Sequence, residues 1–97
     1  MHVVVARFTA ESGSEDTVAA LLAEMIPHAL DEPGCRAYIV NRLEDDPAVF
    51  LLYEQYDDAD AFAEHGKTEA FNDIVLGKIV PLLKERKREI YALVEPA

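Results

Sequence analysis

The sequence has one cysteine, no tryptophan and only four glycines. A single thiol, Cys35, excludes an internal disulfide and a CxxC metal or redox pair, so we expect a small buried side chain at the start of a strand. No apolar run approaches the roughly 20 residues of a membrane span, and "MHVVVARFTA" lacks the basic region and cleavage site of a signal peptide. These absences favour a cytoplasmic protein that does not insert into membranes.

Positive charge is also scarce. Lys and Arg number 9 against 19 Asp and Glu, which gives a formal net charge of -10. Such a surface repels the phosphate backbone, so we expect no nucleic-acid partner. One basic stretch, "KERKR" at 84–88, is interpreted as charge that complements the dipole at the C-terminal end of a helix.

Alternating strand and helix patterns fill the 97 residues, which are enough for a single domain, 1–97. Strands are predicted at 2–9, 35–43, 49–56 and 88–95. One helix is predicted from Ser14, its N-cap, to the "EPG" turn at 32–34, and its apolar face is Val18, Leu21, Leu22, Met25, Ile26, Ala29 and Leu30. A short helix capped by Asp57 or Asp58 should end at a left-handed Gly66. A further helix is expected from Thr68, with Phe71, Ile74, Val75, Ile79, Leu82 and Leu83 on its apolar face and weak points at Gly77 and Pro81.

The order βαββαβ is that of an α+β, ferredoxin-like fold, an antiparallel four-stranded sheet with helices on one face. The strand segments "HVVVARF", "AYIV", "VFLLY" and "IYALV" are apolar at successive positions, so both faces of the sheet favour burial. Two helices cover one face only. The pattern therefore predicts a homodimer in which the second face packs against the same face of another copy.

Two segments carry a resemblance to a known family. "EPGCRAYIV" and "DDPAVFLLYEQYDDADAFAEHGKTEAF" resemble the antibiotic biosynthesis monooxygenase (ABM) domain, in which an EPG-C turn, a Tyr-Glu strand end and a helix with Phe and His precede a second Phe. The resemblance runs over nearly the whole chain and is densest at 32–71. It implies a dimeric α+β barrel of two ferredoxin-like chains.

The resemblance also implies a chemistry. Members similar to quinol monooxygenases oxidise quinol-like or polyketide-like aromatics with O2 and without metal, flavin or haem, because the substrate's own phenolate or enolate supplies the electrons. We therefore expect no cofactor and no metal site. The chain departs from many relatives at Ala70, where they carry a second histidine. It also has Arg7 in place of the Asn that haem-degrading relatives carry on the first strand, which argues against haem.

His65 is the candidate catalytic base, since it is the one histidine inside the motif and an imidazole titrates near neutral pH. The alternative is a helix-end histidine that packs beside Phe62. Candidate substrate contacts share an aromatic or amide side chain near the motif, and they are Tyr53, Phe71, Tyr38, Asn41 and Phe62. Each of them has an ordinary alternative in the core or at the surface. Arg42 and Glu54 are expected to form a structural ion pair, with each other or with Arg7.

Two other functions remain open from the sequence. Some relatives of this fold resemble isomerases or processing enzymes for small signalling sugars, which also use the His-bearing helix. A dimer that binds a small molecule without turnover is the third possibility, and a side-chain-filled core beside His65 would favour it.

Overall fold

The computed structural model describes residues 1–96. Its strands are β1 (His2–Ala10), β2 (Cys35–Arg42), β3 (Val49–Tyr56) and β4 (Leu83–Ala92). Its helices are α1 (Glu15–Leu30), α2 (Ala59–His65), the π-helical segment η1 (Phe71–Ile79) and a single 3₁₀ turn, η2 (Val80–Leu82). The predicted βαββαβ order is confirmed.

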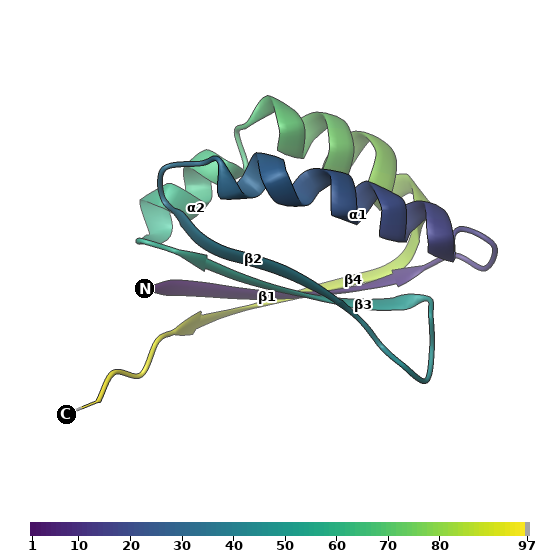
Figure 1. The fold of residues 1–97 in the computed structure, drawn as a ribbon, viewed down its shortest axis with the longest axis horizontal. Helices are drawn as coiled ribbons and strands as arrows, with labels where there is room; N and C mark the ends of the chain where they lie inside the picture. Colours follow the sequence, from purple (N-terminus) through teal and green to yellow (C-terminus); the bar gives the residue numbers. More distant parts are fainter. Residues whose placement is uncertain (97) are drawn as a thin grey trace.

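The four strands form one antiparallel sheet in the order β2-β3-β1-β4, which places β2 and β4 at its edges. All the helices lie over one face of this sheet (Figure 1). This is the α+β, ferredoxin-like arrangement that the sequence predicted. No helix in the described part of the chain is long and apolar enough to cross a membrane.

The core lies between the sheet and the helices. Alternation along β1 turns Val4, Ala6 and Phe8 toward the helices, and β3 does the same with Phe50 and Leu52. From the helices come Val18, Leu22, Met25, Ala29, Ile74, Val75 and Ile79. Cys35, at the start of β2, is buried as expected, and burial raises the pKa of its thiol to about 11.

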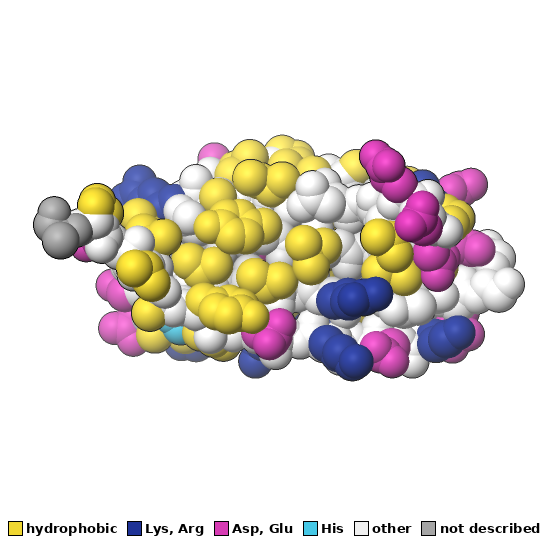
Figure 2. All heavy atoms as spheres, turned by 90° about the horizontal axis from the view of Figure 1, so that it is seen from below, with side chains coloured by type: hydrophobic (Ala, Val, Ile, Leu, Met, Phe, Trp, Pro, Cys, Tyr) yellow, Lys and Arg dark blue, Asp and Glu magenta, His cyan; other side chains and the backbone are white. Residues whose placement is uncertain are grey.

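The opposite face of the sheet has no helix over it, and hydrophobic side chains gather there (Figure 2). Ile39 and Leu51 remain 53% and 42% exposed, and Tyr91 is also exposed. Thus the strands are apolar on both faces, as their sequences indicated, whereas the chain covers only one of them.

Three details of the helices differ from expectation. Ser14 stands at the N-cap of α1, but its side chain makes no cap hydrogen bond, and Leu30 at the other end is exposed. Gly66 has a right-handed helical conformation, with φ −67°, and not the left-handed one that was expected. The chain passes from α2 directly into the segment that Thr68 caps. Asp58 and Thr68 do act as caps, accepting from the backbone N–H groups of Ala61 and Phe71.

The largest correction concerns the C-terminal third. The predicted helix is π-helical over η1, where Val80 N–H bonds to the Val75 carbonyl five residues back. It ends at η2, so that Leu83 already pairs with Ala10 in the sheet. β4 thus begins at residue 83 rather than 88, and the "KERKR" stretch lies in an edge strand rather than at a helix end. An edge strand accepts charge because solvent borders it.

Candidate active site

His65 is the last residue of α2, and its side chain is buried although histidine is often exposed at helix ends. Only 2% of its surface is exposed. The cap at Asp58 fixes the start of this short helix, and its C-terminal end then points the imidazole down onto the sheet. There it contacts the rings of Tyr38 and Tyr56, with centroids 5.9 and 5.3 Å away.

A carboxylate from the turn that packs beside α2 holds one nitrogen of this imidazole. His65 Nδ1 lies 2.9 and 3.0 Å from the two carboxylate oxygens of Glu32, in the "EPG" turn after α1. Because a carboxylate only accepts hydrogen bonds, Nδ1 carries the proton in this contact. In the neutral form of the ring, the lone pair then lies on Nε2, on the other side of the imidazole.

The turn that bears Glu32 packs directly on α2. A Cβ added to Gly34 would lie 2.5 Å from the Cβ of Ala61, so only glycine allows this approach. The Gly34 carbonyl also accepts a hydrogen bond from Asp57 N–H at 2.9 Å, which links the turn to the segment before α2. The close approach thus sets the distance between Glu32 and His65.

A second carboxyl group, Glu54 on β3, faces the free side of the imidazole. Its Oε1 lies 3.9 Å from His65 Nε2 and accepts a hydrogen bond from the Tyr56 hydroxyl at 2.6 Å. Only 5% of Glu54 is exposed. Burial raises the pKa of this carboxyl, while the Tyr56 hydroxyl and His65 act in the opposite direction. Protonation of Glu54 is thus favoured relative to an exposed glutamate.

Aromatic rings surround the remaining sides of His65. Phe62 stacks at 6.2 Å and Phe71 meets it edge-on at 5.0 Å. Burial raises the pKa of both Tyr38 and Tyr56, with the Glu54 charge adding to the effect, so both phenols stay protonated at neutral pH. The environment is therefore dry, apolar and unfavourable to anions.

A small cavity of about 40 Å³ opens beside His65. Its polar lining consists of His65, Glu54, Tyr38, Arg86 and Arg88, and its apolar lining consists of Val4, Ala6, Phe8, Leu52, Phe62, Phe71 and Val75. A few water molecules fit into this volume, whereas ligand pockets of drug-sized molecules measure about 300–1,000 Å³. A ligand the size of an aromatic ring can enter only if side chains at the cavity move.

The structure brings together five of the residues selected from sequence: His65, Tyr38, Phe62, Phe71 and Glu54. Tyr53 lies on the outer face of the sheet, because neighbouring positions of a strand face opposite sides and Glu54 faces inward. The outer face also holds Arg7 and Asn41, whose amide donates to the Leu51 carbonyl at 3.3 Å. These three residues therefore lie on the side of the sheet away from His65.

The predicted Arg42–Glu54 ion pair, and its variant with Arg7, are wrong. Arg42 pairs with Asp16 at 2.9 Å and donates to the Pro47 carbonyl, at the far end of the sheet. The strand register explains this, since Arg42 stands opposite Phe50 and Glu54 stands opposite Tyr38. The cost of burying Glu54 is offset by the Tyr56 hydrogen bond and by the charges of His65 and Arg88 instead.

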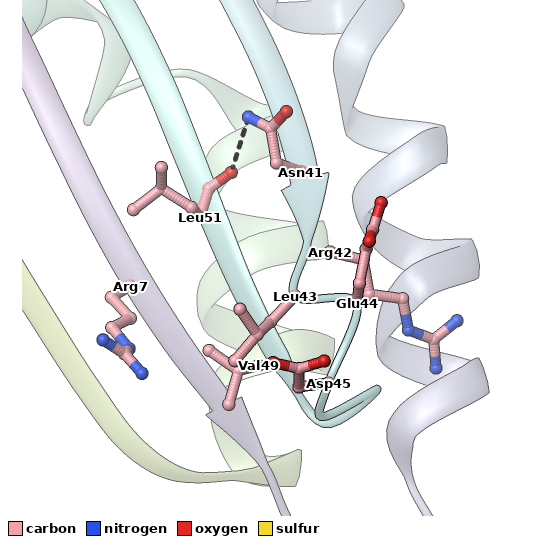
Figure 3. Close-up of a pocket in the computed structure, with 8 residues that line it drawn as sticks. All are labelled: Arg7, Asn41, Arg42, Leu43, Glu44, Asp45, Val49 and Leu51. Carbon is pink, nitrogen blue, oxygen red and sulfur yellow. Dashed lines mark hydrogen bonds between the residues drawn. The ribbon is translucent and has the colours of Figure 1, made fainter.

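Arg7, Asn41 and Arg42 line a different hollow, of about 500 Å³, at the β2–β3 hairpin (Figure 3). Leu43, Val49 and Leu51 provide its apolar surface. Although it is larger, it is an open depression on the uncovered face of the sheet and holds no histidine, cysteine or buried acid. The His65 cavity is therefore the candidate active site.

Sequence reasoning missed Glu32, Tyr56, Arg86 and Arg88. Glu32 belongs to the "EPGC" segment that carried the resemblance. Because a buried imidazole needs a hydrogen-bond partner, an acidic residue in this segment was a possible partner for His65. Arg86 was hidden by the assignment of 84–88 to a helix end, and Arg88 stood at the start of the predicted strand without being selected as a site residue.

The family model and the solved structures that match this chain point to the same family. The family model described as antibiotic biosynthesis monooxygenase matches residues 1–75. No curated protein matches the chain.

Solved structures with the same fold cover nearly the whole chain. A crystal structure of an antibiotic biosynthesis monooxygenase is similar with a TM-score of 0.91 and 26% identity, over 98% of this chain and 100% of that one. A protein from Shewanella oneidensis is 30% identical, with a TM-score of 0.86 over 93% of this chain and 87% of its own. A protein from Mycobacterium tuberculosis is 26% identical, with a TM-score of 0.89 over 99% and 97%.

Proposed function

Because the chain belongs to the antibiotic biosynthesis monooxygenase family, we propose that it is a cofactor-independent monooxygenase that oxidises a quinol-like or polyketide-like aromatic with O2 in the His65 cavity. The family match and the neighbours support a monooxygenase-type function in general. The class of substrate and the absence of a cofactor are the specific parts of the proposal.

His65 would act as the base. Nδ1 donates its proton to Glu32, so Nε2 is the acceptor for a phenolic proton from the cavity side. The imidazolium that forms is then stabilised by the Glu32 carboxylate through the same hydrogen bond. Of all the features of the site, this contact is the observation that carries the proposal, since it orients a buried histidine toward an aromatic-lined space.

Deprotonation makes the substrate an electron donor. The phenolate transfers electrons to O2, one oxygen atom bonds to a ring carbon and the other leaves as water. Hydroquinone would thus give hydroxybenzoquinone and one water, with the ring supplying all four electrons that reduce O2. The apolar rings around His65 exclude water and protect the reactive intermediates.

Particular observations favour each alternative. Glu54, a buried carboxyl with a raised pKa, lies 3.9 Å from His65 Nε2, and such an acid beside a base suits an isomerase that moves protons on a small signalling sugar. The cavity of about 40 Å³ suits a non-catalytic binding dimer, unless a ligand opens it.

Oxygen consumption with a panel of hydroquinones tests the proposal. We expect uptake by the native protein and a loss of roughly 100-fold or more in His65→Asn, because Asn retains a donor near the Nδ1 position but has no ring base. The matched control is His28→Asn, at an exposed histidine of α1, which should retain uptake. No uptake across the panel would reject the oxygenase and favour the isomerase, and equal uptake in His65→Asn would reject the role of His65.

The uncovered face of the sheet supports a second part of the proposal, a homodimer. The exposed side chains of Ile39, Leu51 and Tyr91 would be buried by the same face of a second copy. Pairing of identical faces is the common geometry of symmetric dimers.

A further inference from the structure

Two arginines border the His65 cavity without a direct ion-pair partner. Arg86 and Arg88 stand on β4, in register with Phe8 and Ala6 of β1, so both side chains lie on the helix-covered face of the sheet. Their guanidinium carbons lie 5.8 Å from the Phe8 ring and 5.3 Å from the Phe62 ring. Among residues 1–96, neither forms an ion pair, although the charge of Arg88 acts on Glu54 across the cavity and lowers the pKa of that carboxyl.

Cations are few in this chain, whose net charge is -10. Four of the nine basic side chains are paired with acids: Arg36 with Asp57, Arg42 with Asp16, Lys67 with Glu64 and Lys87 with Glu85. Two of the remaining five line the one cavity that holds His65. Unpaired cations beside an apolar cavity are typical of sites that bind an anion.

An anion can enter the cavity only if a positive charge compensates for the acidic and apolar lining. Glu54 faces the same space, and the raised pKa of the Tyr38 phenol reflects an environment that opposes an oxyanion. Apart from His65, Arg86 and Arg88 are the only basic side chains in its lining. They are thus the groups able to offset the cost of a negative ligand.

We propose that Arg86 and Arg88 form an anion-binding entrance, and that the substrate is an aromatic acid whose carboxylate binds there while its ring hydroxyl reaches His65. The proposal rests on the oxygenase function for the hydroxyl chemistry, whereas the carboxylate subsite stands on the two arginines themselves. Guanidinium groups match a carboxylate with two parallel hydrogen bonds.

The same contacts explain how a cavity of about 40 Å³ admits a ring. In the closed state the guanidinium groups lie over Phe8 and Phe62. A ligand shifts a conformational equilibrium only by its differential affinity for the two states. A bound carboxylate would move the guanidinium groups away from the Phe8 and Phe62 rings, and its hydrogen bonds would replace the cation–π contacts that are lost. A neutral quinol has no carboxylate to form these hydrogen bonds.

Anaerobic calorimetry with gentisate, the carboxylated form of hydroquinone, and with hydroquinone itself tests the subsite without turnover. We expect the native protein to bind gentisate more than about tenfold more tightly. Arg86→Gln and Arg88→Gln should each weaken gentisate binding roughly tenfold and leave hydroquinone unchanged. Both positions are exposed on an edge strand, so the variants should fold, and thermal unfolding checks this.

Lys84→Gln is the matched control, because it removes one exposed positive charge from the same strand outside the cavity lining. It should retain gentisate binding within about twofold. Equal affinity for the two ligands, no binding of gentisate, or an equal loss in Lys84→Gln would overturn the proposal. Preferential binding of gentisate without O2 uptake would reject the oxygenase function and leave the anion subsite in place.

Discussion

The imidazole of His65 lies between two carboxyl groups that differ in their contacts. Glu32 bonds to Nδ1 and does not line the cavity, whereas Glu54 lines the cavity and lies 3.9 Å from Nε2. Glu32 can therefore act only through His65, as a positioning residue. Its carboxylate selects the tautomer with the proton on Nδ1. In the reaction that we propose, it would also stabilise the charged ring during proton transfer.

Replacement of Glu32 by Gln tests this role. The amide oxygen can still accept from Nδ1, so the fold should be retained, but the negative charge is lost. We expect kcat for hydroquinone oxidation to fall roughly 100-fold while KM changes by less than about twofold, because the substrate does not contact Glu32. Glu64→Gln, at an exposed acid of α2, is the control. A rise in KM with unchanged kcat would contradict the assignment.

At the scale of single residues, sequence located the histidine and its aromatic neighbours but not its partners. His65, Phe62 and Phe71 lie within ten positions, so local spacing brings them together. Glu32 is 33 positions away from His65, and only the packing of the "EPG" turn on α2 joins them. Tyr53 was misassigned because both faces of β3 are apolar, and the pattern could not tell which one the helices cover.

Among the elements, the contact between the "EPG" turn and α2 determines the site. Gly34 allows the turn to approach Ala61 closely, and Glu32 then reaches His65 from the same turn. A larger residue at either position would push the turn away from the helix. The geometry of the candidate base therefore depends on two small residues that do not line the cavity.

Gly34→Ala is expected to destabilise the protein by about 1–3 kcal/mol, because its Cβ would overlap that of Ala61. Urea unfolding at fixed protein concentration measures the loss. Gly34→Ala combined with Ala61→Gly should recover part of it, since the overlap is removed. Ala61→Gly alone gives the helix cost of glycine, about 1 kcal/mol. Strict additivity of the two single changes would show that the residues do not couple.

Element type was predictable where local pattern and packing agree. β1, β3 and α1 follow their apolar spacing, and their bounds lie close to expectation. β4 does not, because residues 84–88 are charged at every position and have no strand periodicity. Pairing with β1 makes them a strand, which is a tertiary effect. The π-helical winding of η1 is likewise not visible in the sequence, apart from Gly77. A Cβ added at Gly77 would lie 3.2 Å from the Asn72 carbonyl oxygen, so the winding favours a glycine there.

For the whole molecule, the uncovered face of the sheet is the dominant feature. The chain is a two-layer structure whose strands are apolar on both sides, and helices cover only one of them (Figures 1 and 2). Isolated apolar residues are normal at a surface, but a continuous group of them indicates an interaction site. A second copy of the same face is the partner that we propose.

Leu51→Glu on this face should convert the dimer into a monomer in sedimentation velocity at micromolar concentration, because it places a carboxylate in an apolar interface. Leu76→Glu is a closely matched control. Leu76 is 41% exposed on η1 and Leu51 is 42% exposed on the sheet, so the two changes differ in location rather than in burial. A native protein that sediments as a monomer, or dissociation in both variants, would refute the proposed interface.

β4 forms one edge of the sheet. The free edge of β4 presents backbone N–H and C=O groups that no neighbouring strand pairs. The other strands of the sheet are almost continuously hydrophobic, and an open edge of such a sheet is a template for the addition of strands from other chains. Lys84, Glu85, Arg86, Lys87 and Arg88 are consecutive along this border. Charges at an open border discourage the addition of further strands from other molecules. The basic stretch would then also act as a gatekeeper against amyloid-like growth.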